Sequence, residues 1–308
     1  MTRRRRAAVL GSPIGHSLSP VLHRAAYATL GLDWSYEAIE IDEARLAGFL
    51  DGLDESWAGL SLTMPLKRTV IPLLHGLSAT AAAVDAVNTV LLPGHGRRIG
   101  DNTDVAGMVA ALRVVPAGQV PVERVAILGA GATAAAALAA LARLGVRGAD
   151  VFVRSDHRAA GIRTAADRVG IVARPRSWAE ATSALAADLL ISTVPSGATD
   201  VLAGQLRERQ PEKKAERAGS RQGAGQTERP PAHAKPAMPG AGVLFDIVYD
   251  PWPTRLAAAW MAGGGTVVGG LDLLVEQAAL QVELMTGCRP APVGVMRAAG
   301  EAALSARQ

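Results

Sequence analysis

A glycine-rich turn between an apolar strand and an alanine-rich helix constrains this chain more than any other feature. The sequence VAILGAGATA, residues 125–134, places Gly129, Gly131 and Ala134 in the pattern G-x-G-x-x-A. Glycines at such a turn let the backbone approach a pyrophosphate, whose charge is stabilised by the free N–H groups and the dipole at the helix start. Because the flanking strand and helix are both present, the segment predicts a dinucleotide-binding α/β unit.

Strand-like and helix-like segments alternate along the rest of the chain, which is the pattern of an α/β protein with parallel sheets. In the first half we expect strands at 7–11, 34–41, 58–62, 86–92 and 97–100, and helices at 19–31, 42–52 and 103–113. In the second half we expect strands at 124–128, 149–153, 188–193 and 243–248, and a helix at 271–287. The Pro- and Gly-containing segment 115–123 is expected to connect the two sets. With 308 residues, two domains are expected.

The charge of the chain is concentrated in two segments. The net charge is +4, but residues 3–6 are four arginines and residues 206–240 hold eight basic and four acidic residues. The remainder has 24 acidic and 20 basic residues, which argues against a nucleic-acid-binding surface. We expect both segments to be tails or loops, since 207–237 contains no Val, Ile, Leu, Phe, Tyr or Trp and cannot form a core, so it is interpreted as a flexible insert.

Cysteine content and hydrophobicity limit the class of protein further. A single cysteine, Cys288, excludes a disulfide scaffold and a Cys-based zinc site, and it suits a reducing cytosol. The uncharged run 125–142 is 18 residues long, the lower limit for a transmembrane helix. Most of it is alanine and glycine, so a strand, a turn and a helix explain it better than a membrane span. No apolar segment typical of a signal peptide follows the N-terminal arginines.

Four polar motifs in the first half stand at strand ends or helix starts. They are GSPIGHSLSP (11–20), SLTMPLKRT (61–69), AVNTV (86–90) and GDNTD (100–104). Their chemistry-bearing side chains are those of Ser17, Ser19, Thr63, Lys67, Asn88, Thr89, Asp101 and Asp104. Each motif alone could be a helix cap, a turn or a solvated charge. Ser17 and Ser19 are available to bind an anion at a helix N-terminus, and four such motifs at corresponding ends of one sheet favour a functional site over separate caps and turns.

The strand at 149–153 ends in basic rather than acidic residues. An NAD site usually places Asp or Glu there to bind the ribose hydroxyls, whereas this chain has Arg154, Ser155 and Arg158. Two guanidinium groups and a hydroxyl can bind a 2′-phosphate through charge-assisted hydrogen bonds. The sequence therefore favours NADP over NAD, although Asp156 nearby opposes this.

The ordered set S-x-S, T-x-P-x-K, A-V-N-T and D-N-T-D before a GAG turn resembles the shikimate dehydrogenase family. The resemblance implies reversible, NADPH-dependent reduction of 3-dehydroshikimate to shikimate, in the cytoplasmic chorismate pathway to aromatic amino acids. It implies a substrate domain of 1–104 with 271–308, and a Rossmann-type, doubly wound NADP-binding domain of 105–270. The site would lie in the cleft between them. A monomer and a homodimer both remain open.

The resemblance also assigns roles by position. Lys67 and Asp104 would be the catalytic pair. The substrate ligands would be Ser17, Ser19, Thr63, Asn88, Tyr249 and Gln277. The cofactor ligands would be Gly129, Ala130, Gly131, Ala132, Thr133, Arg154, Ser155, Arg158, Ile247 and Gly270.

Two departures from the family pattern stand out. Val153 occupies a position usually held by Asn, and Ser61-Leu62-Thr63 replaces the N-V-T of many members.

Three alternatives are weighed against this interpretation. A quinate or mixed quinate/shikimate dehydrogenase using NAD is the nearest, and a non-catalytic ligand-binding paralogue is the second. A serine hydrolase using Ser17 or Ser196 with His16 is the third, but the chain lacks a G-x-S-x-G elbow.

Overall fold

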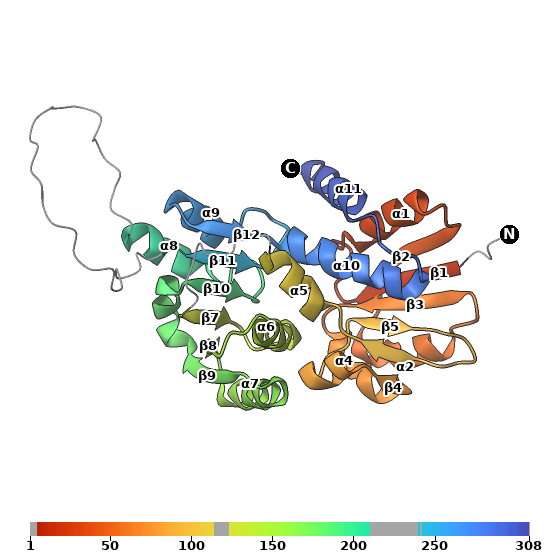
Figure 1. Ribbon diagram of the computed structural model, residues 1–308, viewed down its shortest axis with the longest axis horizontal. Helices are drawn as coiled ribbons and strands as arrows, with labels where there is room; N and C mark the ends of the chain where they lie inside the picture. Colours follow the sequence, from red (N-terminus) through yellow and green to blue (C-terminus); the bar gives the residue numbers. More distant parts are fainter. Residues whose placement is uncertain (1–4, 114–122, 210–239, 241, 308) are drawn as a thin grey trace, which may run out of the picture.

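Two six-stranded sheets, each covered by helices, make up the computed structural model, which describes residues 5–113, 123–209, 240 and 242–307 (Figure 1). The α/β class expected from the sequence is confirmed. The expected connector 115–123 lies almost entirely outside the described residues.

The first sheet is built from the N-terminal third of the chain, in the order β2-β1-β3-β5-β6-β4. Its strands are β1 (Arg5–Gly11), β2 (Trp34–Glu40), β3 (Trp57–Leu62), β4 (Gly76–Leu77), β5 (Thr89–Leu91) and β6 (Ile99–Asp101). The helical segments between them are α1 (Ser19–Thr29), α2 (Glu43–Asp51), α3 (Leu66–Thr69), the 3₁₀ turn η1 (Ile71–Leu73) and α4 (Ala79–Val84).

Within the first sheet, β5 departs from the expected parallel pattern. This strand runs antiparallel to both β3 and β6. The reason is the tight turn between β5 and β6, where Gly94, His95 and Gly96 all have positive φ and the chain reverses on itself. The strand is also shorter than expected, so that Asn88 immediately precedes it rather than lying inside it.

The arginines expected to form an N-terminal tail are partly in the fold. Arg5 and Arg6 belong to β1, and the Arg5 guanidinium donates a 2.7 Å hydrogen bond to the carbonyl of Trp57. The Arg6 guanidinium lies 4.4 Å from the centre of the Trp57 ring. Aromatic faces and a backbone carbonyl therefore hold two charges that composition alone assigns to solvent.

The second sheet is wholly parallel, in the order β12-β11-β10-β7-β8-β9. Its strands are β7 (Val125–Leu128), β8 (Gly148–Val153), β9 (Val172–Ser177), β10 (Leu189–Ser192), β11 (Val243–Asp246) and β12 (Thr266–Val268). Its helices are α6 (Ala132–Arg143), α7 (Asp156–Val169), the 3₁₀ segment η2 (Trp178–Ala186), α8 (Asp200–Arg209) and α9 (Arg255–Ala262). This is the doubly wound order, with the direction of winding reversing at β7.

The alanine-rich run 125–142 forms β7, the glycine turn and α6, as expected. Residues 134–141 of α6 are all buried, and because six of these eight residues are alanines this helix can pack between the sheet and its neighbouring helices. Over the described ranges, no helix is long and apolar enough to cross a membrane.

The insert begins later than the sequence suggests. Residues 207–209 continue α8, whose Leu206 is buried under the second sheet. Almost all of the remaining insert, 210–239 and 241, lies outside the described residues.

Two helices join the halves. α5 (Asp104–Arg113) and α10 (Gly270–Thr286) pack against each other where the two sheets meet, and α11 (Val293–Ser305) packs on α1 and α10 (Figure 1). The start of α10 therefore faces the second sheet while its C-terminal half packs on the first.

Candidate active site

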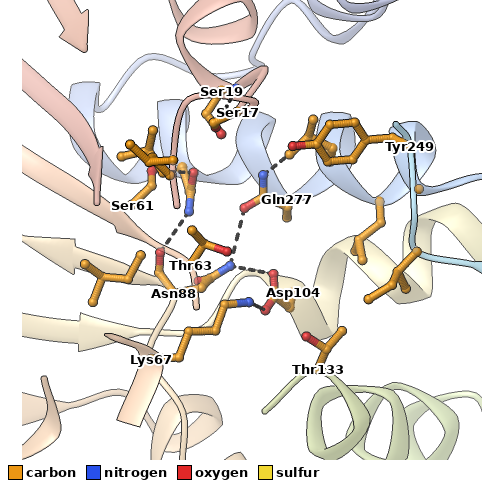
Figure 2. Close-up of a pocket in the computed structure, with 18 of the residues that line it drawn as sticks. Ser17, Ser19, Ser61, Thr63, Lys67, Asn88, Asp104, Thr133, Tyr249 and Gln277 are labelled. Atoms are coloured by element: carbon orange, nitrogen blue, oxygen red, sulfur yellow. Dashed lines mark hydrogen bonds and ion pairs between the residues drawn. The ribbon is translucent and has the colours of Figure 1, made fainter. Parts of the chain in front are cut away.

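A cavity of about 280 Å³ opens between the two halves of the molecule (Figure 2). Its wall includes all eight side chains that the sequence assigns to catalysis or substrate binding, namely Ser17, Ser19, Thr63, Lys67, Asn88, Asp104, Tyr249 and Gln277. Three residues assigned to the cofactor, Thr133, Ile247 and Gly270, line the side nearer the second sheet. Residues far apart in the chain thus share one cavity.

An ion pair lies at the floor of the cavity. The Lys67 Nζ atom donates to Asp104 Oδ2 at 2.5 Å, and the two side chains are only 16% and 8% exposed. Lys67 belongs to the short helix α3, directly after the loop that carries Thr63, whereas Asp104 is the first residue of α5. Asn102 holds that helix start, because its side chain accepts from the N–H of Val105 and donates to the carbonyl of Ala86.

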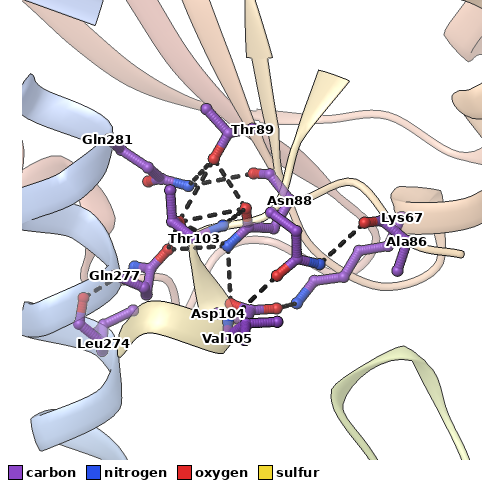
Figure 3. A network of polar contacts seen from close by, with 11 residues as sticks. Lys67, Ala86, Asn88, Thr89, Thr103, Asp104, Val105, Leu274, Gln277 and Gln281 are labelled. Atoms are coloured by element: carbon purple, nitrogen blue, oxygen red, sulfur yellow. Dashed lines mark hydrogen bonds and ion pairs between the residues drawn. The ribbon is translucent and has the colours of Figure 1, made fainter. Parts of the chain in front are cut away.

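The Asn88 amide orients the carboxylate of this pair. Its Nδ2 donates to Asp104 Oδ1 at 2.8 Å and to Thr103 Oγ1 at 2.9 Å (Figure 3). Its Oδ1 accepts from the Thr103 N–H at 2.8 Å. Asn88 is 2% exposed, and hydrogen bonds fix its amide from both sides. By contrast Asp101, the second carboxylate of its motif, accepts from Ser78 and serves the turn.

The two serines lie at the opposite end of the cavity, at the start of α1. The Ser17 Oγ accepts from the Ser19 N–H at 3.3 Å, and the Ser19 side chain is buried. This loop lies against the Thr63 loop, because a Cβ on Gly11 would fall 2.4 Å from a methyl carbon of Thr63. Only glycine therefore permits the close approach that brings both loops to one wall.

Tyr249 reaches this end from the second half of the molecule. Its hydroxyl oxygen accepts a hydrogen bond from the backbone N–H of Leu18, and burial raises the pKa of Tyr249 above its usual 10. The phenol therefore keeps its proton and can donate it to a ligand. Tyr249 and the two serines together present hydroxyls suited to a carboxylate.

The loop that carries Ile247 and Tyr249 is anchored by Asp246. This carboxylate is 1% exposed and accepts from Thr254 Oγ1 at 2.7 Å, and burial raises its pKa. The loop also packs on the start of α10, where a Cβ on Gly270 would lie 2.1 Å from the Ile247 carbonyl oxygen. Gly270 is thus required for contact between loop and helix.

The glycine turn fits a dinucleotide. Gly129 has φ +106°, and a Cβ there would fall 2.6 Å from Thr193 Oγ1. Gly131 is the N-cap of α6 and makes no side-chain cap bond, and a Cβ there would meet no protein atom within 4 Å. The first N–H groups of a 12-residue helix therefore face open space beside a glycine, as pyrophosphate binding requires. Ala130, Ala132 and Thr133 complete the turn.

The basic side chains expected at the adenosine end lie where β8 leaves the sheet beside β7. Arg154, Ser155 and Arg158 are all exposed, and the Arg154 guanidinium lies 5.1 Å from the centre of the Trp178 ring. Within the described ranges neither arginine has an ion-pair partner, so both charges are available to a ligand. Val153, at the position where the family usually has Asn, is buried and packs in the core of the second sheet.

Sequence reasoning missed two polar residues on the cavity wall, Ser61 and Gln281. Gln281 lies one helical turn beyond Gln277 in α10, and it is buried, as is Ser61. The spacing of four residues between two glutamines was the only signal in the sequence, since helical residues i and i+4 share a face.

Comparisons with known proteins agree with this geometry. Family models match residues 9–90 (shikimate dehydrogenase substrate binding domain) and 270–299 (shikimate 5′-dehydrogenase C-terminal domain). A shikimate dehydrogenase (NADP(+)) of Thermus thermophilus is 35% identical over 298 residues, covering 96% of this chain and 98% of the relative. Another, of Synechococcus sp. strain JA-2-3B'a(2-13), is 32% identical over 295 residues, covering 95% of this chain and 93% of the relative.

Solved structures give the same result. The shikimate dehydrogenase of Mycobacterium tuberculosis superposes with a TM-score of 0.77 at 37% identity, covering 97% of this chain and 99% of that one. The Thermus thermophilus enzyme in complex with NADP(H) and shikimate superposes with a TM-score of 0.74 at 32% identity, covering 97% of this chain and 100% of that one.

A doubly wound sheet with a nucleotide-type glycine turn, facing a polar cavity with a Lys–Asp pair, defines a dinucleotide-dependent dehydrogenase. The comparisons specify which kind. The chain belongs to the shikimate dehydrogenase family.

Proposed function

We propose that this protein interconverts 3-dehydroshikimate and shikimate with NADP(H), a step in the synthesis of aromatic amino acids. The Lys67–Asp104 pair is the observation that carries the proposal. It lines the same cavity as Thr133 and Ile247, two residues assigned to the cofactor. The curated relatives and the solved complex bear the same activity in their names.

Reduction of a ketone needs a hydride at carbon and a proton at oxygen, and NADPH supplies the hydride. Lys67 supplies the proton: its ammonium has three N–H bonds, and in the described part of the chain only Asp104 accepts one of them. The other two are free to polarise the carbonyl and stabilise the developing alkoxide. Asp104 holds the ammonium in place and accepts from the substrate hydroxyl.

The cavity divides into two ends that match the two ends of the substrate. Ser17, Ser19 and Tyr249 bind the carboxylate, and Thr63, Asn88 and Gln277 bind the ring hydroxyls. Two hydrogen bonds orient the Gln277 amide for this role. Its Oε1 accepts from Asn88 Nδ2 at 3.3 Å, and its Nε2 donates to the Leu274 carbonyl. We assign residues 1–104 with 271–308 to the substrate domain and 105–270 to the NADP domain, which agrees with the two separate sheets.

The cofactor would be held at three places. Residues 129–133 would bind the pyrophosphate, with Ile247 and Gly270 at the nicotinamide. Arg154, Ser155 and Arg158 would bind the 2′-phosphate, because a guanidinium and a hydroxyl follow β8 directly, before the carboxylate of Asp156 at the start of α7. Two guanidinium groups there, with no ion-pair partner among the residues that the structure describes, would favour NADP over NAD.

The setting of the enzyme is part of the proposal. We place it in the cytoplasm, in keeping with a lone, half-buried cysteine. It would act as a monomer or a homodimer, with small molecules as its ligands.

A spectrophotometric assay of four combinations tests the function. Purified protein is given shikimate or quinate with NADP or NAD, and formation of reduced nicotinamide is followed. Shikimate with NADP should give the highest kcat/KM. A preference for quinate with NAD would favour a quinate dehydrogenase, and no reaction despite shikimate binding would favour a non-catalytic paralogue.

A further inference from the structure

A one-way chain of hydrogen bonds runs behind the cavity, beginning at Tyr36 in β2. The Tyr36 hydroxyl donates to Ser61 Oγ at 2.6 Å, and Ser61 donates in turn to Gln281 Oε1 at 2.7 Å. The tyrosine hydroxyl also lies close to the side chain of Ser19, a proposed carboxylate ligand. The chain therefore starts at one end of the substrate cavity and enters α10.

From α10 the chain continues to the ion pair (Figure 3). Gln281 Nε2 donates to Thr89 Oγ1 at 3.0 Å, and Thr89 donates to Asn88 Oδ1 at 2.8 Å. Asn88 Nδ2 then donates to Asp104 Oδ1, whose other oxygen holds Lys67. Every link has the same donor-to-acceptor direction, and it ends on a group that can only accept.

Burial makes this direction matter. Tyr36 and Thr89 are 0% exposed and Gln281 is 1% exposed, so water does not compete for their hydrogen bonds. A hydroxyl has one proton, and each link therefore fixes the next. Turning the Gln281 amide over would set its oxygen against the Asn88 carbonyl, which now accepts from Gln281 Nε2 at 3.1 Å.

We propose that Tyr36, Ser61, Gln281 and Thr89 are positioning residues for the Lys67–Asp104 pair. Their hydrogen bonds hold the Asn88 amide with its N–H toward Asp104, so that the second carboxylate oxygen stays on Lys67. The Thr103 N–H also donates to Asn88 Oδ1, so this series of hydrogen bonds supplies only part of what orients the Asn88 amide. Tyr36 and Thr89 lie outside the cavity wall and act only through their neighbours. This inference rests on the proposed function.

Thr89 gives the cleaner test, because it does not line the cavity. Thr89→Val keeps the shape and the strand preference but cannot donate to Asn88, whereas Thr89→Ser keeps the hydroxyl. For Thr89→Val we expect kcat to fall about 5- to 10-fold, the size of one lost hydrogen bond, with KM for shikimate within about twofold. Thr89→Ser should restore most of the kcat.

Tyr36 has a matched control in the same aromatic cluster. Tyr27 is also buried and lies edge-on to the same histidine, His23, that stacks on Tyr36, but its hydroxyl has no partner among the described residues. Tyr36→Phe should lower kcat several-fold, while Tyr27→Phe should leave it unchanged. Because both changes act through one chain, Tyr36→Phe with Thr89→Val should be no slower than Thr89→Val alone.

The outcomes separate this inference from the proposed function. If the wild-type protein does not oxidise shikimate, the function is wrong. If it does, and Tyr36→Phe matches Tyr27→Phe, the positioning role is wrong. Equal losses in Thr89→Val and Thr89→Ser, or losses that multiply in the double variant, would also overturn it, since packing alone would then explain them.

Discussion

At the scale of single residues, the chemistry depends on how Lys67 is held. A charge pair this far removed from water costs desolvation energy, and good geometry and further hydrogen bonds are needed to offset that cost. Here the carboxylate accepts from both Lys67 and Asn88, and the remaining protons of the ammonium face the cavity. This arrangement is the one that proton donation by Lys67, as proposed above, requires.

Removal of the Lys67 amine should therefore affect turnover far more than binding. For Lys67→Ala we expect kcat to fall about 10²–10⁴-fold, the usual contribution of general acid–base catalysis, with shikimate affinity within a few-fold. Arg68→Ala is the matched control, since Arg68 is the next residue of α3 and pairs with the exposed Asp85 instead. Steady-state kinetics and a titration with shikimate measure the turnover and the affinity of both variants. Unchanged turnover in Lys67→Ala would end the assignment.

A second residue predicts how stability responds to acid. His23 is fully buried, its Nδ1 bonds the Ser19 carbonyl, and its Nε2 has no partner in the described structure. Desolvation lowers the pKa of His23 from 6.5 to about 4. Between these two pH values His23 is protonated in the unfolded chain but neutral in the folded protein. The free energy of unfolding therefore falls as the pH falls, by up to about 3 kcal/mol.

Urea unfolding of His23→Leu and wild type at neutral pH and at about pH 5 measures this contribution. The variant cannot titrate at this position and should lose less stability on acidification than the wild type. A loss equal to that of wild type would show that other groups carry the acid sensitivity.

The residues that sequence could and could not predict differ in one respect. Ser17, Lys67 and Asp104 belong to short motifs whose chemistry is visible locally. Ser61 and Gln281 are 220 positions apart and become informative only when the fold brings their side chains to 2.7 Å. Their roles depend on tertiary contact, which local pattern does not contain.

At the scale of elements, the turn after β7 was the most predictable part of the fold. A strand, two glycines and a helix specify it locally, and the structure adds that β7 lies at the switch point of the sheet. The antiparallel direction of β5 was not predictable from apolar pattern alone. A strand of three residues carries too little periodicity, and the reversal resides in its turn.

The two glycines of the turn after β7 should respond differently to a methyl group. Gly131→Ala has room in the protein and ordinary φ, so the fold should tolerate it, but the methyl group would occupy the space beside the helix N-terminus. We expect the Kd for NADP to rise at least about tenfold, since the new methyl would displace phosphate from charge-assisted N–H bonds.

Gly161→Ala is the control for this change. Gly161 lies inside α7, and a Cβ there also meets no atom within 4 Å. It should leave NADP affinity unchanged and raise stability by about 0.5–1 kcal/mol, because alanine favours a helix interior. Calorimetric titration with NADP compares the two. Equal affinities would place the pyrophosphate elsewhere.

At the scale of the whole molecule, the cavity lies between the two sheets, where helices of the two halves pack against each other. α5 and α10 pack against each other at this junction, and the loops that carry Ser17 and Tyr249 line the cavity. There the Tyr249 loop of the second half touches Leu18 of the first. The proposed carboxylate site therefore combines residues from both loops.

Arg307, after α11, bridges the same two loops. Its Nη1 donates to the His16 carbonyl at 3.1 Å and to Asp250 Oδ2 at 2.8 Å. His16 adjoins Ser17, and Asp250 adjoins Tyr249, so one guanidinium ties together the two segments that would bind the substrate carboxylate. Both charged side chains remain about a third exposed, so the pair itself adds less than about 1 kcal/mol to stability.

Arg307→Gln should therefore weaken substrate binding without unfolding the protein. We expect KM for shikimate to rise about threefold to tenfold, because each binding event must then order the two loops, while kcat and the unfolding midpoint change little. Added salt should raise KM in the wild type and less in the variant, since salt screens an exposed ion pair. Arg174→Gln is the control, because Arg174 pairs with Asp150 across the exposed edge of the second sheet, on strand β9. A KM in Arg307→Gln equal to that of the control would show that the loops meet without the arginine.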